Sequence, residues 1–290
     1  DGNDLEAINA AITAAKANTD KPSFIEVRTQ IGFGSPKEGT SGAHGAPLGV
    51  EGVKSLKEFL EYPSQEPFFV PEEVYAHYKE IAEEGTKTHE VWEEIFSDYS
   101  KEYPELAQQW EKDFTDITVE ELLAKKEIFE FENKAISTRV VSGMMLNRLK
   151  DTYKNIFGGS ADLASSNMTA LDGETSFSSE NYGGRNIHFG VREHAMAAMG
   201  NGLTLYGGLK SYVATFFVFA DFLKPMARLS SLMNVPLTYV LTHDSIGVGE
   251  DGPTHEPVEQ LTMLRSQPNF YTFRPADATE TAYGWVLALT

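Results

Sequence analysis

The sequence contains no cysteine and no long run of apolar residues. Without cysteine the chain has no disulfide, no thiolate nucleophile and no cysteine-metal site, which suits a reducing compartment such as the cytoplasm. The longest apolar run, near residues 213–220, is far shorter than the roughly 20 residues that span a bilayer. We therefore expect a cytoplasmic chain that does not cross a membrane.

Basic residues are also scarce, with 24 Lys and Arg against 43 Asp and Glu, a formal charge of −19. This balance argues against nucleic acid and anionic membrane surfaces as partners, although a few local cations would suffice for a phosphorylated substrate. Residues 54–132 carry 22 acidic and 8 basic residues, so most of the excess negative charge lies there. Such a run is typical of a solvated helical connector.

Several familiar motifs are missing. The chain has no Walker loop, zinc motif or dinucleotide fingerprint, and it has no Gly-x-Ser-x-Gly elbow of a serine hydrolase. It begins at Asp1 without Met and ends at Thr290 inside a helical pattern without a cap signal. We expect it to be part of a longer polypeptide.

From about residue 133 the apolar pattern alternates between helical and strand periodicity. This alternation predicts an α/β fold, with a parallel sheet covered by helices on both faces. The expected helices span 134–149, 192–206, 219–233, 256–266 and 277–289, and the expected strands span 155–157, 186–189, 211–216, 236–242 and 270–274.

A partial αβ unit precedes this region. Residues 4–18 carry apolar side chains on one helical face, and residues 23–29 have the pattern of a strand. A loop rich in Gly, Ser and Pro follows over residues 32–52, with His44 at its centre, and long ordered loops are often functional. The predicted domains are therefore residues 1–50, an acidic helical linker over 51–132, and residues 133–290.

The most informative segment is the polar loop at residues 242–257, which follows the apolar run 235–241. In open α/β sheets ligands bind at the carboxyl ends of strands, where this loop is expected. It holds His243, Asp251 and His255, and such side chains can hold hydroxyls and move protons. We expect a substrate site here.

Glu193 lies at the first turn of a predicted helix that is otherwise small and apolar. The helix N-terminus favours its carboxylate while burial disfavours the charge, so Glu193 could share or donate a proton. Phe216, Phe219 and Phe222 cross a strand-to-helix junction at spacings of three. They could wall a flat heterocycle, or they could be ordinary core residues.

Arg139 and Ser166 are candidates for binding a phosphate, through a forked cation and a hydroxyl. From the residues alone they could equally be surface or helix-capping groups.

Five segments together resemble transketolase, a thiamine-diphosphate enzyme, and they run in the family's order over almost the whole chain. They are residues 32–48 (GFGSPKEGTSGAHGAPL), 158–167 (GGSADLASSN), 190–202 (GVREHAMAAMGNG), 242–257 (THDSIGVGEDGPTHEP) and 274–277 (RPAD).

The resemblance implies that residues 1–50 are the tail of the diphosphate-binding domain and residues 133–290 the pyrimidine-binding domain. It implies a homodimer with thiamine diphosphate bound between the two subunits. A divalent metal, Mg or Ca, is expected for the full-length enzyme. Its Gly-Asp-Gly segment would lie before Asp1 and a further phosphate-binding Arg after Thr290, so no metal ligand is expected within this chain.

The resemblance also implies residue roles. Glu193 would hydrogen-bond the pyrimidine ring and favour the tautomer that activates the cofactor, which then acts as an electron sink. A Tyr is familiar where this chain has Phe222, which puts one polar contact in doubt. The remaining expected roles are ring contact for Phe216, Phe219 and Phe222; a cofactor-side carboxylate for Asp162; substrate hydroxyls and proton transfer for His44, His243 and His255; a sugar hydroxyl for Asp251; and the substrate phosphate for Arg139 and Ser166.

The implied activity is transfer of a two-carbon glycolaldehyde unit from a ketose phosphate to an aldose phosphate, in the pentose phosphate pathway, by the full-length parent. This chain alone is expected to be inactive. Dihydroxyacetone synthase and, less well matched, deoxyxylulose-phosphate synthase remain alternatives. A further alternative is that the chain acts by itself as a non-catalytic α/β binding module.

Overall fold

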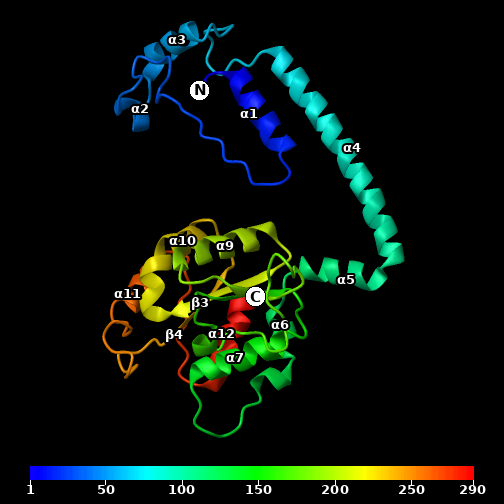
Figure 1. The fold of residues 1–290 in the computed structure, drawn as a ribbon, viewed down its shortest axis with the longest axis vertical. Helices are drawn as coiled ribbons and strands as arrows, with labels where there is room; N and C mark the ends of the chain where they lie inside the picture. The colour runs from blue at the N-terminus through cyan, green and yellow to red at the C-terminus, as the bar shows by residue number, and fades with distance from the viewer. The chain divides into compact units, whose positions relative to one another are not determined.

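The computed structural model describes residues 1–290, which form two compact units, Asp1–Ile95 and Phe96–Thr290 (Figure 1). The helix α4 (Glu72–Glu102) begins in the first unit and ends in the second. None of the helices combines the length and the hydrophobicity needed to cross a membrane.

The first unit is helical. It contains α1 (Leu5–Ala17), α2 (Gly42–Gly45), α3 (Gly49–Phe59) and most of α4. The N-cap of α1 is Asp4, whose carboxylate accepts a hydrogen bond from Ala7 N at 2.9 Å. The predicted helix over residues 4–18 is therefore confirmed, although none of its residues is buried.

The strand predicted over residues 23–29 is wrong. The segment is extended but pairs with no other strand, and its Phe24 is 92% exposed. A strand is stabilised by a ladder of partners. Here one backbone hydrogen bond, from Gly2 N to Arg28 O at 2.7 Å, is all that joins the segment to the chain before α1.

The acidic connector is helical, as predicted. After α4 it continues as α5 (Pro104–Asp113), α6 (Val119–Leu123) and the short 3₁₀ helix η1 (Lys126–Phe129). Exposed pairs such as Lys101 and Asp98, 2.9 Å apart, neutralise part of the acidic surface. Pairs of this kind add little stability, so packing must hold these helices. The later helices do pack, because Ile117, Leu122 and Ile128 belong to the core of the second unit.

The second unit is built on a four-stranded sheet with the order β2-β1-β3-β4. The strands are β1 (Ile156–Ser160), β2 (Asn186–His188), β3 (Lys210–Phe216) and β4 (Thr238–Thr242). Every pair is parallel, which confirms the predicted sheet, and all carboxyl ends meet at one edge. At that edge Phe216 of β3 pairs with Thr242 of β4.

Residues 158–160 belong to β1, which extends past the end of the strand predicted over residues 155–157. The reason is that two glycines allow close strand contact. A Cβ at Gly158 or Gly159 would overlap a carbonyl oxygen of the neighbouring strand, Tyr212 O or Ile187 O respectively.

Helices cover both faces of the sheet (Figure 1). Along β3, Tyr212 packs into one apolar cluster and Val213 into the other, as strand alternation requires. The first cluster involves α6, α7 (Thr138–Leu149) and α12 (Ala278–Leu289), and the second involves α9 (Glu193–Tyr206), α10 (Ala220–Leu232) and α11 (Gln260–Arg265). The short helices α8 (Ala164–Asn167) and η2 (Phe217–Phe219) complete the unit.

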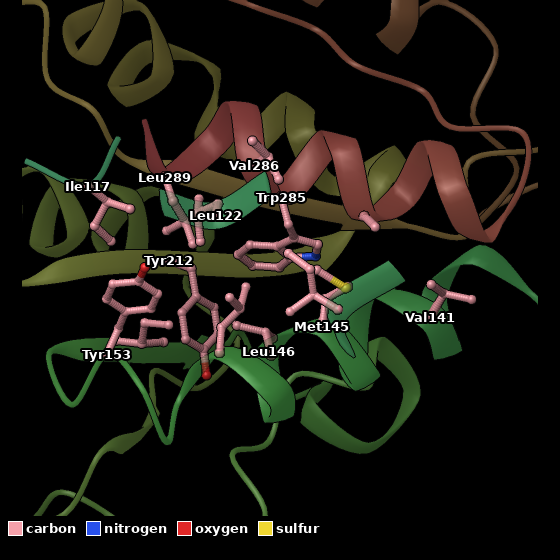
Figure 2. Close-up of a cluster of buried hydrophobic side chains, with 14 of the residues drawn as sticks. Ile117, Leu122, Val141, Met145, Leu146, Tyr153, Tyr212, Trp285, Val286 and Leu289 are labelled. Carbon is pink, nitrogen blue, oxygen red and sulfur yellow. The ribbon is translucent and has the colours of Figure 1, made fainter. Parts of the chain in front are cut away.

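Side chains from α7, α12 and β3 form the first cluster, which Figure 2 shows around Tyr212. Met145 and Leu146 are fully buried, and the indole nitrogen of Trp285 donates to Ser142 Oγ at 3.0 Å. Each large apolar side chain buried here contributes about 1.5–3 kcal/mol. Since α12 closes this cluster, the last helix of the chain is part of the core.

Two predicted elements near the C-terminus differ from the structure. The helix expected over 256–266 is shortened to α11, and the strand expected over 270–274 is absent. No ladder joins that segment to β4, and Tyr271 is 97% exposed. Its last residue, Arg274, instead donates hydrogen bonds to Asp244, so the segment supports the loop after β4 rather than extending the sheet.

Candidate functional site

Polar and aromatic residues gather at the carboxyl edge of the sheet. Asp162 follows β1, Phe216 ends β3, and His243 follows β4. Asp162 and His243 both have left-handed backbone, with φ of 63° and 55°. This conformation costs of order 1–3 kcal/mol for residues other than glycine, and such strain is often found at functional sites.

Four rings form a continuous surface there, which we call the aromatic wall: Phe216, Phe219, His243 and His255. The imidazole of His243 stacks on Phe216, with 3.7 Å between centroids, and Phe216 stacks on Phe219 at 6.2 Å. His255 meets the edge of this stack, 6.0 Å from Phe216 and 5.3 Å from Phe219. The structure thus brings together four of the predicted site residues.

Phe222 lies at the outer end of the wall, on α10. Its ring is 6.1 Å from that of Phe219, and the side chain is 60% exposed. The three phenylalanines therefore follow one another as the sequence suggested, but only Phe216 is buried.

Arg139 of α7 joins the site through His243. Its Nη1 lies 3.0 Å from His243 Nε2 and donates to the backbone oxygen of Ser166 at 3.1 Å. The hydroxyl of Ser166 makes no hydrogen bond. The cation, the hydroxyl-bearing residue and the imidazole form a small polar group that could receive an anion.

The charge state of His243 follows from its surroundings. Burial first, and the Arg139 guanidinium second, lower the pKa of His243 below its ordinary value, and His255 acts in the same direction. Asp251 and Asp244 oppose this shift. The ring is therefore neutral at neutral pH and offers one nitrogen as an acceptor.

The loop that carries the histidines is tied down at both ends. Arg274 donates to Asp244 Oδ2 at 2.6 Å and to Asp244 O at 2.9 Å. Near the other end the ring of His255 lies 5.3 Å from that of Phe219, and Thr254 Oγ1 lies 2.8 Å from His255 Nδ1. Asp251 is exposed between these anchors, where its charge reaches His243.

Glu193 is the first residue of α9 and is 7% exposed, which confirms its predicted burial at a helix start. No side chain or backbone group donates a hydrogen bond to its carboxylate, and the carboxylate oxygens are not fully buried. A largely desolvated carboxylate gains from a hydrogen-bond partner. An acceptor of this kind is suited to a ligand that brings its own donor.

Two other predicted residues are exposed at the surface of their own units. His44 lies on α2, in the first unit, and is exposed. Asp162 is also exposed, beyond the end of β1, and has no ion pair. The structure contains no group of three His, Asp or Glu side chains that could hold a metal ion.

The sequence pattern did not predict a buried chain of hydrogen-bonded polar side chains next to the aromatic wall. It runs from His243 through Thr242 and Asn167 to Ser160 and Thr169. Asn167 stands beside Ser166 in the quoted segment 158–167, but the pattern offered no reason to separate a buried Asn from a capping one.

Family models match nearly the whole chain. Residues 1–117 match the model described as transketolase, thiamine diphosphate binding domain. Residues 134–290 match the model described as transketolase, pyrimidine binding domain. The chain belongs to the transketolase family.

Curated transketolases and solved structures agree. The chain is 52% identical to the transketolase of Halalkalibacterium halodurans and 49% identical to that of Geobacillus stearothermophilus, in both cases over 100% of this chain and 43% of the relative. A transketolase from Leishmania mexicana superposes with a TM-score of 0.89 at 38% identity, covering 99% of this chain and 43% of that one. The chain thus spans less than half the length of the transketolases it matches.

A second solved structure is of a transketolase from Pichia stipitis in complex with sedoheptulose 7-phosphate. It matches with a TM-score of 0.84 at 39% identity, covering 99% of this chain and 44% of that one.

Proposed function

We propose that this chain supplies the pyrimidine-binding side of a transketolase active site. The whole protein would move a two-carbon glycolaldehyde unit from a ketose phosphate to an aldose phosphate. The observation that carries this proposal is Glu193, a largely buried residue of a transketolase-family chain whose carboxylate accepts no hydrogen bond from the protein. The domain limits that accompany it are residues 1–50, 51–132 and 133–290.

The residues of this chain fit the pyrimidine half of thiamine diphosphate only. Phe216 and Phe219 offer stacked faces to a flat ring, and Glu193 offers an acceptor to a ring nitrogen. Phe222 would contact the outer edge of the ring, and Asp162 the side that faces the other subunit. When bound, the cofactor supplies the electron sink that the reaction needs. Phosphate and metal ligands are not assigned to this chain.

The substrate phosphate would bind at Arg139, Ser166 and His243. The forked guanidinium and the unpaired Ser166 hydroxyl support this assignment, as does the neutral imidazole beside them. His255 and Asp251 would contact sugar hydroxyls, and His44 would join them from the diphosphate side. His243, His255 and His44 are the candidates for proton transfer.

The assembly is part of the same proposal. The protein would act as a cytoplasmic homodimer in the pentose phosphate pathway, with a divalent metal, Mg or Ca, held by residues outside this chain. Sugar phosphates would be its substrates, and neither nucleic acid nor a membrane would be a partner.

The test is an assay of the whole enzyme with xylulose 5-phosphate and ribose 5-phosphate, with and without thiamine diphosphate. We expect turnover only with the cofactor. Turnover without cofactor, or none with it, would contradict the proposal. Faster reaction with formaldehyde than with ribose 5-phosphate would indicate dihydroxyacetone synthase instead.

Calorimetry on this chain alone completes the test. We expect weak or no binding of thiamine diphosphate. Tight binding would show that the diphosphate ligands had been placed on the wrong residues.

A further inference from the structure

Asn167 is a polar side chain at the end of α8 with no solvent exposure. Its Oδ1 accepts from Thr242 Oγ1 at 2.5 Å, and its Nδ2 donates to Ser160 Oγ at 3.0 Å. Thr242 Oγ1 also lies 2.9 Å from His243 Nδ1. One buried amide is therefore connected, through one hydroxyl, to the imidazole of the aromatic wall.

The direction of these hydrogen bonds follows from Arg139. A guanidinium only donates, so His243 Nε2, 3.0 Å from Arg139 Nη1, must be the accepting nitrogen. In a neutral imidazole the other nitrogen, Nδ1, then carries the proton. Nδ1 donates to Thr242 Oγ1.

The hydroxyl of Thr242 has a single hydrogen, which is left for Asn167 Oδ1. With its oxygen on that side, the amide of Asn167 presents its NH₂ to Ser160 Oγ. If the Asn167 amide were turned around, the Thr242 hydroxyl would donate to His243 Nδ1. His243 Nε2 would then carry the proton, and its N–H would face the N–H of Arg139. Only one direction of these hydrogen bonds gives every donor in the series an acceptor.

We propose that Asn167 and Thr242 are positioning residues that fix the Nδ1–H tautomer of His243 and thereby hold Arg139 toward the sugar phosphate. The last step depends on the proposed function; the tautomer does not. Arg139 is anchored only through Nη1, to His243 and to the Ser166 backbone, so Nε and Nη2 donate to no protein group. These two nitrogens form the fork that suits a phosphate.

The charges around His243 are compatible with this state. Arg139 faces it from α7, and Asp244, Asp251 and His255 face it from its own loop. The ring nitrogens themselves are engaged by the uncharged Thr242 and by Arg139, so hydrogen bonding decides which nitrogen carries the proton.

The direct test is ¹⁵N NMR of this chain with labelled histidine, at about pH 8, well above the ordinary pKa of imidazole. Substitution of His243 by Gln assigns its ring signals among those of the 7 histidines. We expect a protonated Nδ1 and a pyridine-type Nε2. A protonated Nε2 would overturn the proposal without any further variant.

Asn167→Leu should invert the tautomer. The Thr242 hydroxyl would lose its acceptor and turn to His243 Nδ1, because a buried hydroxyl without an acceptor costs more than moving the exposed Arg139 side chain into water. Ser160→Ala is the matched control, since it perturbs the same buried chain but leaves Asn167 Oδ1 in place. An unchanged tautomer in Asn167→Leu, or an inverted tautomer in both variants, would contradict the proposed positioning of His243 by Asn167 and Thr242.

Kinetics of the whole enzyme test the second step. Asn167→Leu should raise KM for a phosphorylated ketose about tenfold, as expected for loss of one charge-assisted hydrogen bond. KM for a non-phosphorylated ketose should change less than about twofold, and this difference between the two ketoses would not result from a general loss of packing. Equal effects on both ketoses would refute the orienting role. An enzyme inactive even without substitutions would instead refute the proposed function and leave the NMR result standing.

Discussion

Replacing Glu193 should make the protein more stable and less active at the same time. Glu193 as a residue is 7% exposed, and its carboxylate oxygens accept no hydrogen bond from the protein but are not fully buried, so their desolvation costs at most about 1–3 kcal/mol. Because Glu193 lies at the start of α9, the helix dipole stabilises its negative charge by about 0.3–1 kcal/mol. The desolvation penalty is larger than the stabilisation by the helix dipole. Glu193→Met, which keeps the length of the side chain, should therefore stabilise the second unit by about 1 kcal/mol.

For a unit of this size that difference raises Tm by about 2–4 °C. The measurement is thermal unfolding of the chain without cofactor, followed by circular dichroism. Glu280→Met is the matched control, because Glu280 also lies in the first turn of a helix, α12, but accepts a hydrogen bond from Ala276 N at 2.7 Å. The control should lower Tm.

The same substitution should reduce the activity of the whole enzyme by at least about 100-fold, the lower range for loss of a group that acts on proton transfer. Glu193→Gln should be nearly as poor, since its amide nitrogen presents donors where the carboxylate only accepts. A lower Tm for Glu193→Met would refute the reasoning about the unpaired carboxylate, and unreduced turnover would remove Glu193 from the site.

Three further predictions concern His243, the core and the loop after β4. The pKa of His243 is lowered in the folded state, so its contribution to stability is present above the unfolded-state pKa and is lost as pH falls through the folded-state pKa. In urea titrations the free energy of unfolding should therefore fall less steeply below about pH 6.5 in His243→Gln than in the unsubstituted chain. Leu146→Ala should cost about 2–5 kcal/mol in the same titrations, because the side chain is fully buried, whereas Leu287→Ala, 63% exposed, should cost less than about 0.5 kcal/mol. Arg274→Ala should speed amide hydrogen exchange in the loop that begins at Asp244, while Tm changes by less than about 3 °C because the pair is half exposed; a protected loop would contradict the anchoring role.

Much of the second unit could be predicted from the sequence because its pattern is local. The strand at β3 and the helix at α12 are written in runs of apolar residues whose period matches the element. Burial of Glu193 could also be expected, since the residues around it are small and apolar. These features depend on neighbours along the chain, which a sequence displays directly.

The predictions were wrong where the structure of a segment depends on a neighbouring strand rather than on the periodicity of its own residues. Residues 23–29 and 270–274 have strand-like composition but no neighbouring strand to pair with, so propensity alone misled. Gly158 and Gly159 lie past the end of the predicted strand 155–157, but in the structure they belong to β1 and allow close packing between strands. The contact between Arg139 and His243, 104 residues apart, follows only from the fold.

The features that mark the site share one physical property: each is unfavourable for folding alone. Glu193 is buried without a partner, and His243 and Asp162 occupy left-handed backbone at strand ends. Left-handed backbone also occurs at Glu61, Phe68, Met168, Asn234 and Asn269, so it marks the site only together with the other features. Phe216 is different, since burial stabilises it, and it stacks on the strained His243. The core therefore holds the costly residues in place, and a ligand that donates to Glu193 would remove one of these costs when it binds.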